Sequence, residues 1–308
     1  MTPVGSSVPR APDASSNFAQ NWTFSGEKDF FGVARGEFDV TENTDIWAAA
    51  GLRDSEEHNI LANPNADAAG AISSYRFENY REDLIATGEI GLRTQFDIGS
   101  VGHRVSIQAS TYKSDSKNAY GFSWPPVDTG SLYDSEQVPM PTGLITGGVM
   151  FSPKTTSKIE TSSVALADTL AFMDERVLVT LGARYQVVEQ HSYDYNTGAE
   201  NCQSFVDRPT ICGYDASTVT PVAGLVVKPS DEISLYANYI EGLIPGEIVP
   251  ATVNGVPVVN AGDIFDPFAS EQIEVGAKYD GGTLGGTLSI FRAIWRSEER
   301  RVGKECRS

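Results

Sequence analysis

The chain has few basic residues, few histidines and few cysteines. Its 308 residues include 23 Lys or Arg against 41 Asp or Glu, which gives a formal net charge of −18. This acidic balance argues against nucleic-acid binding, because nothing would offset repulsion by the phosphates. The three histidines, His58, His103 and His191, are scattered, and GxSxG, HExxH and P-loop patterns are absent. The sequence therefore predicts no metal site, no cofactor and no enzymatic activity.

Long hydrophobic runs are also missing. No apolar stretch reaches the roughly 18 residues of a membrane helix, which excludes a helical membrane protein. The absence of such runs does not exclude a membrane β-barrel, because apolar and polar residues alternate in its spanning strands, which are therefore only half apolar.

Residues 1–26 lack the apolar and basic regions of a signal peptide, and we expect a loop or an incomplete strand there. The segment is either a loose arm or an internal start in a longer gene.

Apolar and polar residues alternate along much of the chain. In residues 84–98 one side carries Ile90 and Leu92, and the other carries Glu89 and Arg93. A period of two over this length is typical of a strand with one apolar and one polar face. The same pattern predicts ten strands, at residues 30–40, 45–53, 84–98, 101–111, 159–172, 177–187, 218–228, 233–239, 272–279 and 284–292.

The connections between these strands alternate in length. Five are short and rich in turn residues, and the other four are long and polar, at residues 57–78, 116–157, 191–217 and 242–267. Membrane β-barrels have short turns at one end and long loops at the other, whereas soluble sandwiches mix loop lengths at both ends. The sequence therefore predicts an all-β fold, an antiparallel transmembrane β-barrel of about ten visible strands.

Aromatic and charged residues agree with a barrel. Aromatic residues lie near the short turns and suggest a girdle at the membrane interface: Phe38, Phe96, Phe172 and Tyr279. The predicted inward faces carry Arg93, Arg104 and Arg184, which indicates a wet or plugged lumen. Asp168 interrupts an apolar face, and a bulge there would turn it inward, unless the register is wrong.

Three segments resemble a known family when taken together and in order. They are VALADTLAFMDERVLVTLGARYQ (164–186), TPVAGLVVKPSDEISLYANYIEGLIPG (220–246) and SEQIEVGAKYDGGTLGGTLSIF (270–291). Each is similar to the barrel of TonB-dependent siderophore receptors. The resemblance implies a Gram-negative outer-membrane transporter that binds ferric siderophores and takes energy from the TonB complex. It also implies a plugged barrel of about 22 strands.

The resemblance predicts that residues 27–295 are an interior part of such a barrel. The plug domain and the N-terminal region that contacts TonB would then lie outside this chain. Outer-membrane lipid would cover the outer face, and Arg93, Arg104 and Arg184 would support the plug. Three alternatives are a receptor for haem, a cobalamin or a glycan, a soluble β-sandwich binding module, and an outer-membrane protease or lipase. The last would need clustered catalytic residues, which the sequence does not show.

The last thirteen residues break with the rest of the chain. Residues 296–308, RSEERRVGKECRS, resemble the in-frame translation of a sequencing adapter, and we predict that they are not native. Without their five basic and three acidic residues, the net charge is −20. Cys306 would also be removed, which leaves two cysteines.

Two site predictions follow from the resemblance. Siderophore contacts in the family come from aromatic and polar residues on extracellular loops, and the best match is Tyr120, Phe122 and Trp124, followed by Tyr133. Packing of the loop against itself explains these aromatics equally well. Tyr75, Phe77 and Tyr80 form a second cluster. An extracellular loop also favours a disulfide between Cys202 and Cys212, although free thiols or a metal pair are alternatives.

Overall fold

The computed structural model describes residues 2–3, 8–205 and 209–295, and this part of the chain is all-β, as predicted. The segment 296–308, predicted to be adapter-derived, lies outside the described residues. None of the described residues forms a helix that could span a membrane. The long strands are β2 (Phe24–Thr41), β3 (Thr44–Ala66), β4 (Ala71–Ile98), β5 (Val101–Phe122), β8 (Lys154–Phe172), β9 (Val177–Ser192), β12 (Tyr214–Val227), β13 (Ile233–Ile244), β16 (Phe268–Asp280) and β17 (Gly285–Trp295).

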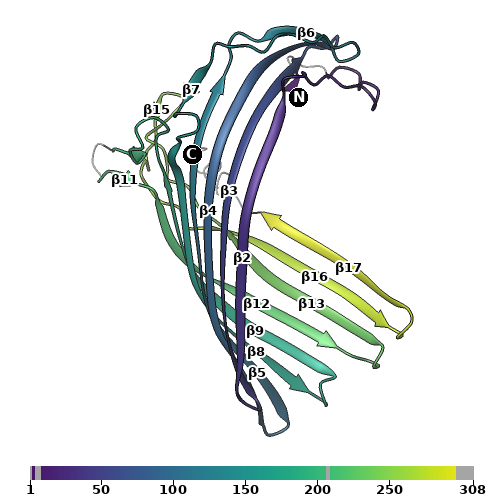
Figure 1. The fold of residues 1–308 in the computed structure, drawn as a ribbon. Coiled ribbons are helices and arrows are strands. Elements are labelled where there is room, and N and C mark those ends of the chain that lie inside the picture. The colour runs from purple at the N-terminus through teal and green to yellow at the C-terminus, as the bar shows by residue number, and fades with distance from the viewer. Residues whose placement is uncertain (1, 4–7, 206–208, 296–308) are drawn as a thin grey trace.

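These ten strands pair with their neighbours in chain order and antiparallel, in one curved sheet (Figure 1). Within the described residues, β2 and β17 each pair on one side only. The sheet therefore has two open edges and is not closed into a barrel. A sandwich would need a second large sheet packed on the first, which the described residues do not contain.

The remaining strands are short and lie at the end of the sheet that carries the long loops. Short strands β6 and β7 extend the sheet on β4 and β5, and β1 pairs with β3 in parallel. Two separate hairpins are β10 with β11 and β14 with β15. The bounds are β1 (Thr2–Pro3), β6 (Val127–Ser131), β7 (Ile145–Gly147), β10 (Cys202–Gln203), β11 (Ile211–Cys212), β14 (Thr252–Val253) and β15 (Val256–Pro257).

One predicted connection is wrong. Residues 57–78 were expected to form a long polar loop, but β3 and β4 continue through them and leave only residues 67–70 as a turn. Their pairing is unbroken from Thr44↔Thr94 to Ala66↔Ile72. The polar composition misled the prediction, because only the part of a strand that packs against lipid needs an apolar face.

The register defines two faces of the sheet. We call inner the face that carries Glu89, Arg93, Arg104 and Arg184, and outer the face that carries Ile90, Ile107 and Leu181. Cross-strand pairs place the members of each set side by side. Many large apolar side chains of the outer face are exposed, among them Phe38, Ile90, Phe96, Ile107, Val164, Leu166, Leu181, Tyr185, Val219, Ile273, Val275, Tyr279, Leu288 and Ile290. An apolar face of this extent needs a covering, as lipid would provide.

Asp168 does not turn inward. Its pairing with Val105 and Leu181 runs through without a bulge, so it stays on the outer face. There Asp168 Oδ2 lies 2.8 Å from His103 Nδ1, and the imidazole stacks on Phe96 with ring centroids 5.1 Å apart. The charge is tolerated because a neighbouring strand supplies its partner.

Several inner-face aromatics lie flat across a glycine of the next strand. Trp47 covers Gly91, Tyr120 covers Gly147 and Tyr236 covers Gly276. A Cβ at any of these glycines would overlap the ring. Such pairs bury the exposed backbone of a glycine and fix the register between strands.

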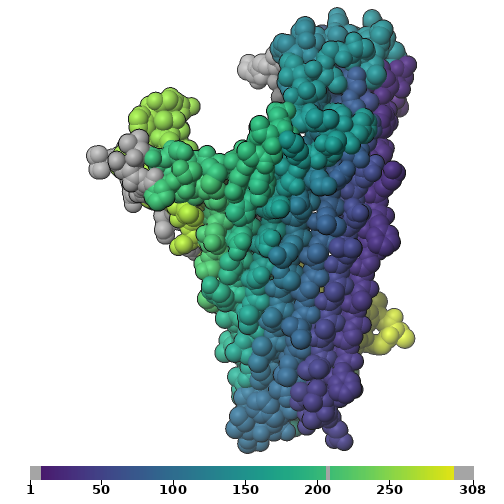
Figure 2. Space-filling view, turned by 60° about the vertical axis from the view of Figure 1, so that its left-hand side comes forward, coloured from purple at the N-terminus to yellow at the C-terminus, as the bar shows by residue number. Residues whose placement is uncertain are grey.

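At the long-loop end, the segment before β2 packs along the loop between β6 and β7. The Gln20 side chain donates to Glu136 O at 2.8 Å and accepts from Val138 N at 2.9 Å. Trp22 Nε1 donates to Val138 O at 3.1 Å. Figure 2 shows this loop group at the top of the sheet, separated by a notch from the yellow-green loops near residue 250.

Candidate functional site

The predicted aromatic residues do not form one cluster. Tyr120 and Phe122 end β5 on the inner face, with ring centroids 6.5 Å apart. The Tyr120 ring also meets Tyr195, from the loop after β9, at 5.1 Å and nearly perpendicular. Phe77 of β4 pairs directly with Phe122, so one of the second set of aromatics joins this patch. The inner face therefore carries an aromatic patch at its long-loop end.

Trp124 and Tyr133 lie apart from that patch. Trp124 precedes a cis proline, Pro125, and is 69% exposed. Tyr133 donates its hydroxyl to Arg10 O at 2.8 Å, and the Arg10 guanidinium lies 5.7 Å from the ring centre. Tyr133 thus helps to fasten the N-terminal segment to the loop.

Tyr80 faces the opposite way from Phe77. It is 8% exposed on the outer face, where its ring meets Phe151 at 5.0 Å, and burial raises the pKa of its hydroxyl. His58 joins the same cluster and lies 3.0 Å from Glu78 Oε1, while Arg76 pairs with the other oxygen of Glu78. This cluster holds the loop before β8 against β3 and β4, with Tyr80 and Glu78 buried and Phe151 still exposed.

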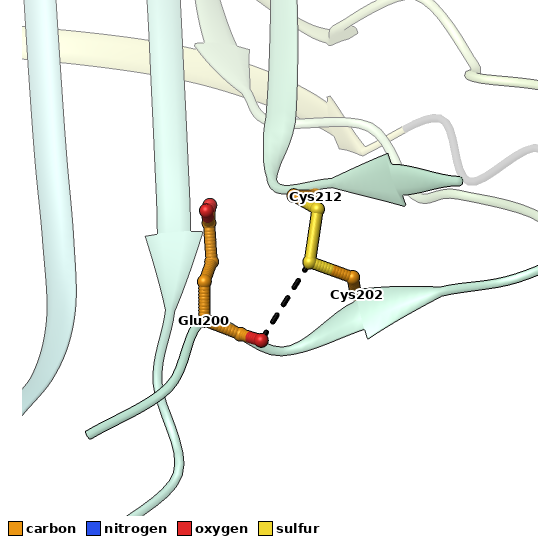
Figure 3. A group of neighbouring side chains, drawn as sticks. All are labelled: Glu200, Cys202 and Cys212. Atoms are coloured by element: carbon orange, nitrogen blue, oxygen red, sulfur yellow. Dashed lines mark hydrogen bonds between the residues drawn. A yellow bond between two sulfur atoms is a disulfide. The ribbon is translucent and has the colours of Figure 1, made fainter. Parts of the chain in front are cut away.

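A disulfide joins Cys202 and Cys212, with an S–S distance of 2.07 Å (Figure 3). The two cysteines are cross-strand partners in the β10–β11 hairpin. Glu200 lies close to both sulfurs, but sulfurs bonded to each other cannot act as thiolate ligands for a metal. The Glu200 carboxylate instead lies 2.5 Å from His191 Nδ1. The sequence did not indicate that a histidine lies next to the disulfide hairpin.

A pocket of about 450 Å³ lies beside this hairpin at the long-loop end. We call it the hairpin pocket. Its lining is mainly amide, hydroxyl and aliphatic, with one carboxylate, Glu247: Gln190, Ser192, Asn201, Cys202, Gln203, Ile211, Gly213, Tyr214, Glu247, Ile248 and Pro250. Tyr214 donates to Phe265 O at 3.1 Å, and burial raises the pKa of Tyr214. No sequence pattern marked this pocket, because its walls come from four separate stretches of the chain.

The three predicted lumen arginines have different surroundings. Arg93 lies 3.6 Å from Asp45 Oδ2 and 5.2 Å from the Trp47 ring centre, and Arg104 pairs with Glu175. Arg184 has no ion pair with any residue that the structure describes. It lines an inner-face hollow of about 420 Å³ together with Ser106, Gln108, Gln186 and Thr220. Arg184 is thus available for a carboxylate from elsewhere.

The sequence did not single out Trp47 and Glu89 as a pair. Trp47 is 7% exposed and its Nε1 donates to Glu89 Oε1 at 2.9 Å, while Gln108 donates to the other carboxylate oxygen at 2.9 Å.

A further hollow of about 560 Å³ lies on the outer face near Ile46, Ile90 and Ile107. Its apolar lining fits lipid and not a polar ligand.

Comparison with known proteins identifies the family. The family model described as TonB dependent receptor-like, beta-barrel matches residues 3–293. The chain belongs to the TonB-dependent receptor family. Members of this family are transporters and not enzymes.

Individual relatives of known name or structure support the same family. The chain is 34% identical to the ferrichrome receptor FcuA of Yersinia enterocolitica over 289 residues, which cover 92% of the chain and 36% of FcuA. The crystal structure of BauA, the ferric preacinetobactin receptor of Acinetobacter baumannii, superposes with a TM-score of 0.77 at 30% identity, covering 94% of the chain and 41% of BauA. The siderophore receptor PiuA from the same species has a TM-score of 0.66 at 20% identity, over 89% of the chain and 41% of PiuA, and shows the fold alone. The chain spans about two fifths of these proteins.

Proposed function

We propose that the chain forms part of an outer-membrane receptor that binds ferric siderophores and imports them by TonB-coupled active transport. The observation that carries the proposal is the 34% identity to a ferrichrome receptor over nearly the whole chain. The two faces of the sheet agree with it, because the apolar outer face suits lipid and the polar inner face suits a filled lumen. On this proposal the long-loop end is extracellular.

The inner face supports a role for a plug domain. Arg184 lies in a polar hollow and has no carboxylate partner among the described residues. Arg184 is exposed in this chain, and a plug that covered it would leave its guanidinium unpaired unless it supplied an acceptor, so a carboxylate of the plug is its proposed partner. Arg93 and Arg104 would instead hold the wall itself, since Asp45 of β3 and Glu175 of the β8–β9 turn already pair with them.

The experiment is iron uptake in cells that lack the native receptor. The receptor that contains this chain is expressed in the deletion strain, and uptake of radioactive iron is measured with a panel of ferric siderophores. We expect uptake of at least one ferric siderophore, and we expect deletion of TonB to abolish it. Haem, cobalamin and a glycan belong in the same panel, because the alternative is a receptor for one of them. Growth on one of those nutrients alone, or uptake without TonB, would contradict the proposal.

A further inference from the structure

Side chains with metal-binding atoms gather where the disulfide hairpin meets the end of β9. The sulfurs of Cys202 and Cys212 and a carboxylate oxygen of Glu200 all lie within 4.8 Å of one another (Figure 3). Among the residues that the structure describes, no other three His, Cys, Asp or Glu side chains come as close. In the oxidised protein the sulfurs are bonded to each other, so the group binds no metal in this form.

The backbone around the two cysteines is tied to the sheet independently of the S–S bond. Between Glu200 and Cys202, Asn201 N donates to Ser192 O at 2.8 Å. On the other arm, Cys212 lies two residues before β12, whose first residue pairs with β9. Breaking the S–S bond therefore leaves both thiols next to the Glu200 carboxylate.

His191 of β9 holds the Glu200 carboxylate in this position. A carboxylate only accepts hydrogen bonds, so His191 Nδ1 donates to Glu200 Oε1 across 2.5 Å. The imidazole has room because residue 213 is glycine: φ is +77° there, and a Cβ on Gly213 would lie 2.5 Å from Nδ1. In metal sites, hydrogen bonds of this kind orient a carboxylate ligand. His191 is thus a positioning residue and not itself a ligand.

We infer that reduction of the Cys202–Cys212 disulfide turns this corner of the hairpin into a zinc site. Its protein ligands are the two cysteine sulfurs and the Glu200 carboxylate. Water completes the tetrahedron, because both cysteines are exposed. Two thiolates with one carboxylate suit Zn²⁺, whereas Ca²⁺ and Mg²⁺ prefer oxygen ligands alone. The metal then joins the two arms of the hairpin in place of the S–S bond.

The reductant is a small thiol. Two molecules of it deliver two electrons and two protons: the S–S bond breaks, Cys202 and Cys212 become thiols, and the small thiols join in a disulfide of their own. Zn²⁺ then displaces both cysteine protons, because the thiolate is the form that binds metal. This inference goes beyond the proposed function, because it does not depend on which ligand is transported.

The test measures metal binding by the full receptor that contains this chain. The receptor is reduced with a phosphine, separated from it without oxygen, and titrated with Zn²⁺ or Co²⁺. We expect the reduced form to bind one more metal ion than the oxidised form and to release about two protons per Zn²⁺ near pH 7. Bound Co²⁺ should show thiolate-to-metal charge-transfer absorption. Zn²⁺ should slow alkylation of Cys202 and Cys212, mapped by mass spectrometry, at least about fivefold, because a bound thiolate is withheld from the reagent.

Variants assign the ligands. Cys202→Ser combined with Cys212→Ser keeps every other cysteine of the receptor and should lose the additional ion. Glu200→Gln should weaken Zn²⁺ binding at least about tenfold. Glu189→Gln is its matched control, since Glu189 lies on β9 near His191 but outside the group of close ligand atoms. His191→Gln keeps an N–H donor and should therefore bind Zn²⁺ more tightly than His191→Ala.

Each result decides one part of the assignment. Equal metal binding by the oxidised and reduced receptors overturns the site, and so does an additional ion that survives in the double cysteine variant. Unchanged affinity of Glu200→Gln overturns the ligand set, and equal affinity of the two His191 variants overturns the positioning role. A heat-modifiability gel of each oxidised variant separates loss of metal binding from misfolding. None of these outcomes alters the expectation for siderophore uptake.

Discussion

At the residue scale, the inner wall depends on a few close aromatic contacts. The Trp47 indole lies across Gly91, donates to Glu89 and stacks with Arg93. One side chain therefore joins the backbone of β4 to two of its charged groups. A side chain at residue 91 would displace the ring and disturb all three contacts.

We predict that Gly91→Ala destabilises the receptor by about 1–3 kcal/mol, because the new methyl group overlaps Trp47. The measurement is the temperature at which the folded band disappears in a heat-modifiability gel. Gly88→Ala is the matched control on the same strand, since its Cβ would meet only Thr111 Cγ2 at 3.5 Å. Equal stability of the two variants would contradict the role assigned to Trp47.

At the scale of elements, the β3–β4 hairpin is the main departure from expectation. Residues 57–78 are polar and were interpreted as a loop, yet every residue from 57 to 66 has a partner in β4. Only the turn at residues 67–70 leaves the ladder, and there Gly70 N donates to Asp67 O at 3.1 Å. Backbone pairing runs through this part of the hairpin, and at its tip Ala66 and Ile72 pack with Leu132 and Phe18 in a small buried apolar cluster.

We predict that Glu57→Pro weakens this hairpin, because β3 pairs on both sides at Glu57 and proline removes a backbone donor. We expect the substitution to lower the stability of the hairpin by about 1–3 kcal/mol. Ala68→Pro is the control, since residue 68 is the second position of the turn, where proline fits. Hydrogen–deuterium exchange of residues 57–78 measures the effect. Fast exchange of this segment in the unmodified receptor would restore the loop interpretation.

Sequence predicted the elements where both faces have a clear chemical difference. The alternation of Glu89 and Arg93 with Ile90 and Leu92 located β4 and its faces, because one side is apolar and the other is polar. The same signal is absent around Glu57 and Glu82, where both faces of the strands carry charged and polar side chains. The hairpin pocket also escaped prediction, because Gln190, Gln203 and Glu247 come together only through the pairing of distant strands and loops.

At the scale of the whole molecule, the arrangement predicts opposite responses to charge on the two faces. Leu166 is 53% exposed on the outer face, and its neighbour Ala165 lines the inner hollow beside Arg184. In a membrane, the first position contacts hydrocarbon and the second contacts the aqueous or plug-filled lumen.

We predict that Leu166→Arg destabilises the receptor in a bilayer by about 2–4 kcal/mol. Ala165→Arg, the control one residue away, should have a smaller effect on stability in the same assay. Urea titration in lipid vesicles, followed by tryptophan fluorescence, provides the measurement. A neutral Leu166→Arg would indicate that this face meets water, as in a soluble protein.

The length of the β3–β4 hairpin has a consequence for access to the cell surface. Strand β4 has 28 residues and measures about 90 Å along its axis, about twice what a tilted strand needs to cross a hydrocarbon core of about 30 Å. In the proposed orientation the turn at residues 67–70 therefore stands tens of ångströms from the lipid. An antibody or a phage tail would meet this turn well before it could reach the inner wall. The part of the receptor that is most accessible from the medium is therefore the tip of this hairpin, and not the inner wall.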